Sequence, residues 1–114
     1  MNDYCLFCKI NHRSIPADIV YEDDLVLAFK DISPQAPCHI LIIPKVHINT
    51  INDIDPSHQS LLGHMVLTAK NIAAENALSD SGYRLIMNCN QDGGQTVFHI
   101  HLHILGGRQM VGFG

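Results

Sequence analysis

Apolar positions along the chain follow two periods, and each period predicts a different kind of element. Spacings of three and four residues after Pro56 predict one long helix. Asp55 suits the N-cap of this helix, Pro56 its first turn and Gly82 its C-terminal stop. Residues 5–11 are expected to form a second, short helix or turn. The apolar stripe of the long helix consists of Leu61, Leu62, Met65, Val66, Ala69, Ile72 and Ala73.

Apolar residues gather in five further segments, which are expected to form strands. Two close prolines confine residues 33–37 to a loop. Hairpin-length links between most strands favour a mainly antiparallel sheet. We therefore predict one α+β domain over residues 1–114, with five strands, one long helix and one short helix. The predicted strands are Ile19–Glu22, Leu25–Lys30, His39–Ile43, Tyr83–Asn90 and Val97–Leu105.

The composition narrows the classes of function. Of the 114 residues, 46% are hydrophobic and 16% are charged, and the formal net charge is -4. A mildly acidic chain lacks the positive field that holds a phosphate polymer, which argues against nucleic acid as a partner. The apolar runs are too short for a bilayer and the first residues lack a signal-peptide pattern, so we expect no membrane partner and a cytoplasmic location. The four cysteines are then expected to stay reduced.

Three of the eight histidines alternate along one predicted strand: His99, His101 and His103. On a strand these side chains share one face, with neighbours roughly 6–7 Å apart. The residues between them are expected to face the core, together with Phe98 and Ile104. Strict alternation of three histidines is unusual for a merely solvated face, so the row predicts a functional cleft.

Two chemistries use such a row. A neutral imidazole can attack phosphorus and form a covalent intermediate. Alternatively, histidines two apart on a strand can hold a catalytic zinc ion that keeps a position open for water. Just upstream, residues 93–96 offer flexible backbone, an amide and a hydroxyl, and N–H groups near Gly94 can hold phosphate oxygens. Glycines alone would indicate only a tight turn, but beside the histidine row we favour phosphate binding.

The segment His99–Leu105 resembles the motif of the histidine triad (HIT) superfamily, in which histidine alternates with apolar residues. Asp92–Phe98 before it and Gly106–Met110 after it are similar to the histidine triad nucleotide-binding (Hint) branch. Two further blocks, Phe29–Pro37 and Ile43–Ile48, stand in the expected order. The resemblance covers nearly the whole chain and implies a HIT-like fold whose sheet extends across a homodimer.

The resemblance also implies a hydrolase of purine nucleoside phosphoramidates such as adenosine 5′-monophosphoramidate. His101 would attack the α-phosphorus, and water would hydrolyse the nucleotidyl-histidine. His103 would bond phosphate oxygens, while Gln95 and Thr96 would lie near the leaving group; many Hint proteins have serine in place of Thr96. The remaining contacts implied are Asn88 to the phosphate, Asp31 to the ribose hydroxyls, and Phe7, Ile10, Phe29 and Ile32 as the slot for the base.

Cys5 and Cys8 have the spacing of two ligands on one metal ion. The candidates for the other two ligands are His47 and His99, a combination that holds structural zinc in some bacterial HIT proteins that this chain resembles. Free buried thiols and a redox dithiol are the alternatives. If zinc is held here, His99 is structural and only the other two histidines of the row face the substrate.

The other cysteines and histidines are expected to have no site role. Cys38 and Cys89 are interpreted as packing residues. The histidines expected on the surface or on a helix face are His12, His39, His58 and His64.

Several functions therefore compete. The closest rival to the phosphoramidase is a dinucleoside polyphosphate hydrolase of the same superfamily. A zinc hydrolase with His99 and His101 as catalytic ligands is a second class, but no motif supplies the carboxylate base that it needs. A module that binds purine nucleotide without turnover is the third.

Overall fold

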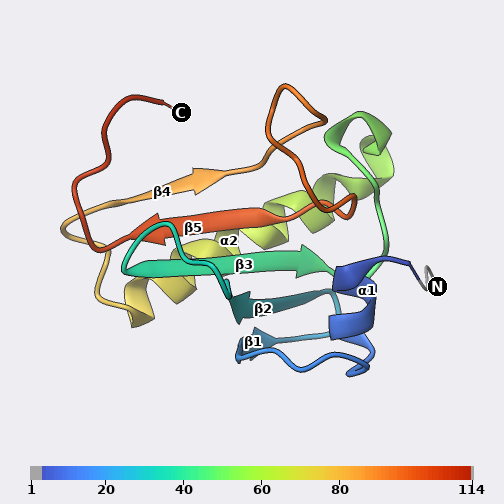
Figure 1. Cartoon of the computed structure of the whole chain (residues 1–114), viewed down its shortest axis with the longest axis horizontal. Helices are drawn as coiled ribbons and strands as arrows, with labels where there is room; N and C mark the ends of the chain where they lie inside the picture. The colour runs from blue at the N-terminus through green and yellow to red at the C-terminus, as the bar shows by residue number, and fades with distance from the viewer. Residues whose placement is uncertain (1–3, 114) are drawn as a thin grey trace.

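The computed structural model describes residues 4–113, and its centre is one five-stranded antiparallel sheet (Figure 1). The predicted α+β fold class is confirmed. In sheet order the strands are β1 (Ile19–Glu22), β2 (Val26–Lys30), β3 (Cys38–Pro44), β5 (Leu102–Gly106) and β4 (Tyr83–Ile86). The helices are the short α1 (Leu6–Asn11) and the long α2 (Gln59–Glu75), and the 3₁₀ turns η1 (Ile51–Asp53) and η2 (Pro56–His58) precede α2.

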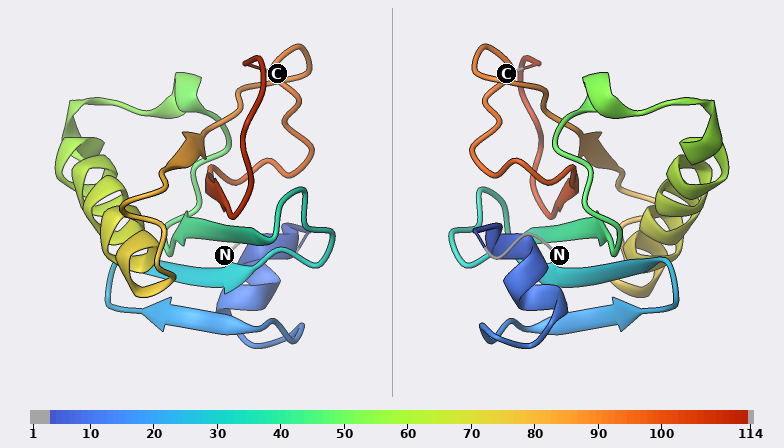
Figure 2. Two further views of the ribbon diagram at one scale, coloured as in Figure 1. Left: turned by 90° about the vertical axis from the view of Figure 1, so that its left-hand side faces the viewer. Right: turned by 90° about the vertical axis from the view of Figure 1, so that its right-hand side faces the viewer.

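The two helices lie on opposite sides of the sheet (Figure 2). Because side chains alternate across a strand, Val26 and Ala28 of β2 pack toward α2, whereas Leu27 and Phe29 pack toward α1. Strand β3 alternates in the same way. Both central strands are thus buried on both faces, which explains why their sequences are continuous apolar runs. Within the described residues, neither helix is long and apolar enough to cross a membrane.

Neither end of α2 lies where the sequence predicted it, since α2 begins at Gln59 and its N-cap is His58. Asp55 caps the turn η2 through its carboxylate, and α2 follows directly. At the other end, Ala77 takes the left-handed conformation with a φ of 59°. The N–H of Leu78 then donates to the carbonyl of Ala73 at 2.9 Å and closes the helix. The predicted stop, Gly82, lies in the turn before β4 instead.

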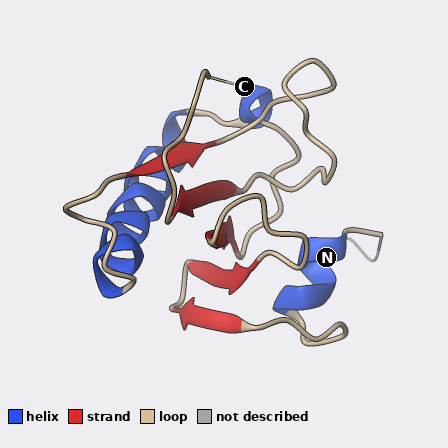
Figure 3. Cartoon of the chain, turned by 60° about the vertical axis from the view of Figure 1, so that its left-hand side comes forward, coloured by secondary structure: helices blue, strands red, loops and turns tan. Residues whose placement is uncertain are grey.

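The predicted strand Val97–Leu105 is wrong at its start, because β5 begins only after His101. His99 and His101 precede the ladder on an irregular segment, which is drawn as loop in Figure 3. A backbone hydrogen bond joins this segment to the chain after β3, from the N–H of Ile100 to the carbonyl of Ile48 at 2.8 Å. Of the three alternating histidines, only His103 therefore lies on β5.

The link between β4 and β5 is longer than predicted. Strand β4 ends at Ile86 rather than at Asn90. Phe98, expected on the core face, is 48% exposed. Inside the link, a Cβ on Gly93 would lie 2.5 Å from the carbonyl oxygen of Cys89, so this close approach of two backbone segments requires glycine.

Met65 and Val66 are neighbours on α2 that differ in burial, since Met65 is 1% exposed and Val66 is 51% exposed. The predicted stripe included both residues, and Val66 does not belong to it. Met65→Ala should lower the free energy of unfolding by about 2–5 kcal/mol, because it leaves a cavity between α2 and the sheet. Val66→Ala should change it by only about 0.5 kcal/mol. Urea unfolding measures both, and equal losses would contradict this packing.

Candidate active site and metal centre

A pocket of about 250 Å³ opens on the face of the sheet that carries α1. Its lining combines aromatic and aliphatic side chains with two imidazoles and a carboxylate, a mixture typical of small-molecule sites. The lining includes Phe7, Ile10, Phe29, Asp31, His101 and His103. Most of the residues predicted to bind substrate thus lie together, and Ile32 and Thr96 line the same pocket.

The ring of His101 is fixed from two sides and is only 6% exposed. Its Nδ1 lies 2.8 Å from the carbonyl oxygen of His99. Because a carbonyl oxygen only accepts, Nδ1 carries the proton and donates it to this bond. Phe7 makes an edge contact with the ring at a centroid distance of 4.9 Å. The neutral ring therefore keeps an unshared electron pair on Nε2, which is the form that a nucleophilic imidazole needs.

A chain of hydrogen bonds also fixes the tautomer of His103. The backbone N–H of Gln35 donates to Nδ1 of His39 at 3.0 Å. The proton of neutral His39 must then sit on Nε2, which lies 2.9 Å from Nδ1 of His103 and donates to it. The proton of His103 is left on Nε2. That atom is buried and has no hydrogen-bond partner among residues 4–113, so it is a donor available to a ligand.

His39 is the site residue that the sequence interpretation missed. It was expected at the surface, but it is buried in β3 and its ring contacts His103 at a centroid distance of 5.2 Å. Its position on a strand of apolar residues was the available signal. A histidine in such a strand must find hydrogen-bond partners when the strand is buried. The sequence could not indicate that one partner is a loop N–H four residues back.

Burial keeps the rings of His101 and His39 uncharged. Desolvation lowers the pKa of His101 below its ordinary value and outweighs the bond to the carbonyl of His99 and the nearby Asp31, which both raise it. Desolvation likewise lowers the pKa of His39, against the opposing effect of Asp31. His101 and His39 are thus neutral near pH 7, as their tautomers require.

Asp31 is held at the wall of the pocket, directly after β2. Its Oδ1 accepts the N–H of Ser33 at 2.7 Å, and its Oδ2 lies 3.6 Å from Nε2 of His39. Unused lone pairs on both oxygens remain for donors such as hydroxyl groups. The predicted contact of this carboxylate with a ribose stays a prediction.

Gln95 is buried and its side-chain amide braces the loop before β5. Its Nε2 donates to the carbonyls of Asn49 and Val97 at 2.8 and 3.0 Å, and its Oε1 accepts the N–H of Asn90 at 2.9 Å. Thr96 is exposed at the pocket. The predicted position of Gln95 and Thr96 near a leaving group is not tested by these contacts.

Two predicted phosphate contacts lie outside the lining of the pocket. In the part of the chain that the structure describes, neither Asn88 nor Gly94 lines it. The N–H of Gly94 donates to the carbonyl of Gln91 at 3.0 Å and closes a turn. Contact of these two residues with a phosphate stays a prediction.

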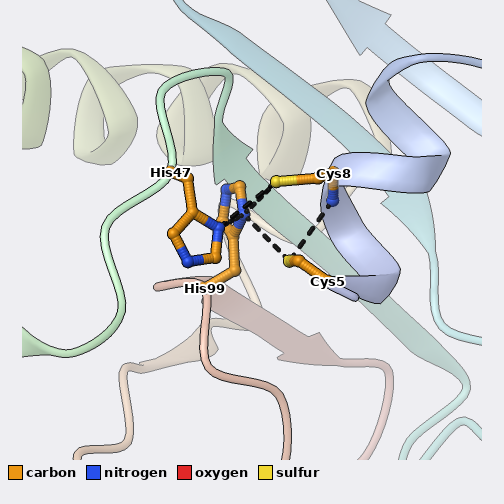
Figure 4. Close-up of side chains that lie close together, drawn as sticks. All are labelled: Cys5, Cys8, His47 and His99. Carbon is orange, nitrogen blue, oxygen red and sulfur yellow. Dashed lines mark hydrogen bonds between the residues drawn. The ribbon is translucent and has the colours of Figure 1, made fainter. Parts of the chain in front are cut away.

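The four residues predicted to hold zinc meet beside the pocket: Cys5, Cys8, His47 and His99 (Figure 4). Their ligand atoms all lie within 4.8 Å of one another. Cys5 is the N-cap of α1, where its Sγ accepts the N–H of Cys8 at 3.4 Å. The Sγ of Cys8 lies 3.2 Å from Nδ1 of His47, and the Sγ of Cys5 lies 3.4 Å from Nδ1 of His99. The cluster therefore joins α1 to two segments that flank the sheet.

The donor atoms of this cluster fit a tetrahedral zinc ion. Nε2 of His99 lies 2.8 Å from the carbonyl oxygen of Pro44, and Nε2 of His47 bonds to Oδ1 of Asn49. Since both oxygens accept, each Nε2 carries the proton and each Nδ1 directs its lone pair into the cluster. Outer hydrogen bonds of this kind orient imidazole ligands in zinc sites. Two thiols and two nitrogens so oriented are the donor set of a closed structural site.

A second group of ligand-type residues, Asp31, His39 and His103, fits a metal less well. The Nε2 of His39 already carries the proton that it donates to Nδ1 of His103, so this nitrogen pair is occupied by a hydrogen bond. His101 belongs to neither group within residues 4–113. A catalytic zinc ion held by His99 and His101 therefore finds no support in this arrangement.

Comparisons with known proteins agree over almost the whole chain. The family model of the HIT domain matches residues 12–110. The chain is 56% identical over 110 residues to the purine nucleoside phosphoramidase of Escherichia coli (strain K12), which covers 96% of this chain and 92% of that protein. The crystal structure of a HIT family hydrolase from Legionella pneumophila Philadelphia 1 superimposes with a TM-score of 0.93 at 57% identity, over 94% of this chain and 96% of that one. A histidine triad protein from Clostridium difficile gives a TM-score of 0.95 at 42% identity, over 100% and 99%.

The free energy of unfolding should fall as the pH is lowered from about 6.5 to about 4, in part because of His103. Burial and then the neighbouring His101 and His39 lower the pKa of folded His103 to about 4, against an opposing effect of Asp31. In the unfolded chain this ring takes up a proton near its ordinary pKa of about 6.5. Acid therefore favours the unfolded state in this window. Urea unfolding near pH 7 and near pH 5 should show a smaller fall for His103→Gln than for the unsubstituted protein.

The control for this measurement is His12→Gln, which replaces an exposed histidine outside the pocket. Its stability should fall as steeply as that of the unsubstituted protein. An unchanged fall in His103→Gln would contradict the effect assigned to burial of this ring.

Proposed function

The chain belongs to the HIT domain family, and from this membership and the geometry of its pocket we propose that it hydrolyses purine nucleoside phosphoramidates. Such a substrate, adenosine 5′-monophosphoramidate for example, yields AMP and an amine. One observation carries the proposal: His101 lines the pocket with its Nδ1 bonded to a carbonyl, so Nε2 is left as a nucleophile. The activity named for the E. coli relative supports the substrate class.

In the first step of the proposed reaction, Nε2 of His101 attacks the α-phosphorus, and the phosphorus–nitrogen bond to the leaving amine breaks. The amine departs with the bonding electron pair and takes up a proton from the solvent. The ring that has gained the nucleotidyl group is positively charged, and its Nδ1–H bond to the carbonyl of His99 stabilises that charge. The Nε2–H of His103 donates to a phosphate oxygen, which supplies the partner this buried donor lacks within residues 4–113.

In the second step, water attacks the same phosphorus and gives up a proton to the solvent, and the bond to His101 breaks with its electron pair returning to Nε2. AMP leaves, and the ring returns to its starting tautomer. One difficult displacement is thus divided into two easier ones, as in other enzymes with a covalent intermediate. The dinucleoside polyphosphate hydrolase remains the closest rival because it differs only in the leaving group. Rates on the two substrate classes distinguish them.

The rest of the pocket suits a nucleoside. Phe7 and Phe29 pack edge to face at a centroid distance of 5.5 Å and, with Ile10, provide apolar surface for a purine ring. Ile32 is almost fully exposed beside them and would be covered by the base. The carboxylate of Asp31 can accept from the two hydroxyls of a ribose.

We also propose that Cys5, Cys8, His47 and His99 hold one structural zinc ion. Two thiolates and two Nδ1 atoms would close the coordination shell, so the ion would serve stability and not activate water. The support is the inward orientation of the two Nδ1 atoms and the closeness of all four ligand atoms, which lie within 4.8 Å of one another. When bound, the ion would tie the N-terminus of α1 to the sheet.

The homodimer and the cytoplasmic location also stay predictions. Strand β4 is an outer strand, and in the described chain no other strand pairs with its far edge, where a second copy could pair. Pairing of two such edges would join the two sheets, as the resemblance implies.

His101→Ala should lower phosphoramidase activity by about 10³-fold or more, because the variant has no atom that can form the covalent bond. Incubation with a substrate labelled in the nucleotide, followed by quenching and peptide mapping, should give label on His101 in the unsubstituted protein only. Binding of AMP should survive in the variant, since the slot and Asp31 are intact.

The matched control is His58→Ala, which alters a histidine of η2 outside the pocket and should keep full activity. Full activity in His101→Ala would eliminate the covalent mechanism. AMP binding with no turnover of any phosphoramidate by the unsubstituted protein would support the non-catalytic module instead.

The purified protein should contain one zinc ion per chain, measured by elemental analysis. Cys8→Ser should lose the ion and melt at a lower temperature, because a ligand that binds only the folded state stabilises it by about 4 kcal/mol at a thousand times its dissociation constant. Cys38→Ser changes a thiol outside the cluster and should keep the ion. Equal zinc content in the two variants would contradict the proposed site.

A further inference from the structure

Helix α1 supplies residues to two places at once. Its N-cap and first turn carry Cys5 and Cys8, which belong to the metal cluster. The same six-residue helix carries Phe7 and Ile10, which line the nucleotide pocket. A short helix of this length is not stable on its own and takes its position from what it packs against. A shift in the position of the cysteines therefore also shifts the wall of the pocket.

Phe7 is the side chain that connects the two places most directly. Its ring contacts His99 of the cluster at a centroid distance of 6.0 Å and His101 of the pocket at 4.9 Å. It also meets Phe29 edge to face at 5.5 Å. The buried ring thus lies against a proposed metal ligand, the proposed nucleophile and the apolar slot together.

His99 gives a second connection through its own backbone. Its imidazole belongs to the cluster through Nδ1, while its carbonyl accepts the Nδ1–H of His101 at 2.8 Å. A metal ion that fixes the side chain of His99 also limits the movement of this carbonyl. The orientation of His101 then depends on the cluster.

The cluster holds together less firmly without a metal ion. The Nδ1 atoms of His47 and His99 lie 3.1 Å apart, and each directs a lone pair inward. Without an ion, these two lone pairs face each other and the thiols of Cys5 and Cys8, and thiols are weak donors. A metal ion replaces both thiol protons with strong bonds, so α1 is expected to be more narrowly placed when it is bound.

We infer that the cysteines of this cluster are positioning residues for the nucleotide pocket, so that metal and nucleotide each strengthen the binding of the other. The inference rests on the proposed function and on the proposed zinc ion. It goes beyond a structural ion, which would raise stability without changing the affinity of a folded protein for nucleotide. By linkage, the factor by which zinc tightens AMP binding must equal the factor by which AMP tightens zinc binding.

The test is a pair of titrations on the full chain with its thiols reduced. Calorimetry gives the dissociation constant of AMP for the zinc-loaded protein and for protein stripped by a chelator, with circular dichroism to show that the stripped protein is folded. Competition with a chromophoric chelator gives the zinc affinity with and without saturating AMP. We expect zinc to tighten AMP binding by about 5-fold or more, and AMP to tighten zinc binding by the same factor.

Cobalt provides a readout that does not need the stripped protein. With Co²⁺ in place of zinc, AMP should shift the visible absorption bands of the ion, because the ligand positions move with α1. Cys38→Ser keeps the cluster and should keep both the coupling and the spectral shift. Cys8→Ser should bind AMP as weakly as the stripped protein.

The outcomes distinguish failure of this coupling from failure of the nucleotide pocket or of the zinc site. Equal AMP affinity of folded loaded and stripped protein, with unchanged cobalt bands, overturns the inference and leaves the proposed function intact. Failure of AMP to bind either form would refute the nucleotide pocket itself, and failure to bind any metal would refute the zinc proposal; the inference falls with either. Matching coupling factors in the two titrations support it.

Discussion

The hydrogen bond from Nδ1 of His101 to the carbonyl of His99 is the interaction on which the site depends. In a regular strand that carbonyl would point sideways to a neighbouring strand and would not reach the side chain two residues on. Because β5 begins only at Leu102, the carbonyl is free to accept the imidazole proton. The irregular start of the strand therefore determines which nitrogen of His101 is available for the proposed attack. It also places His99 in the proposed metal cluster, while the other two histidines line the pocket.

Much of the fold could be predicted from the sequence because its signals are local. The stripe of α2 and the apolar runs of β2 and β3 report directly which faces are buried. The start of β5 could not be predicted, since the alternation of its residues fits a longer strand. Just before β5, the N–H of Ile100 donates instead to the carbonyl of Ile48, a residue far away in the sequence. The end of α2 was missed because Ala77 accepts a left-handed conformation that glycine more often provides.

Site residues too could be predicted only where the signal is local in the sequence. Cys5 and Cys8 could be paired from their spacing, but His47 and His99 came from a family resemblance, because no local pattern joins residues so far apart. The role of His39 could not be predicted, because it depends on the N–H of Gln35 and on His103, which only the folded sheet brings near it. Residue type indicates which chemistry a side chain can do. The tertiary structure decides which atom of it is free.

A crystal structure of the protein with AMP bound is the most direct test of the central claim. The account predicts the base in the slot beside Phe7 and Phe29, with the phosphorus about 3–3.5 Å from Nε2 of His101 and in line for attack. It also predicts an oxygen of the phosphate on Nε2 of His103. A phosphate bound elsewhere, or a metal ion on Nε2 of His101, would contradict it.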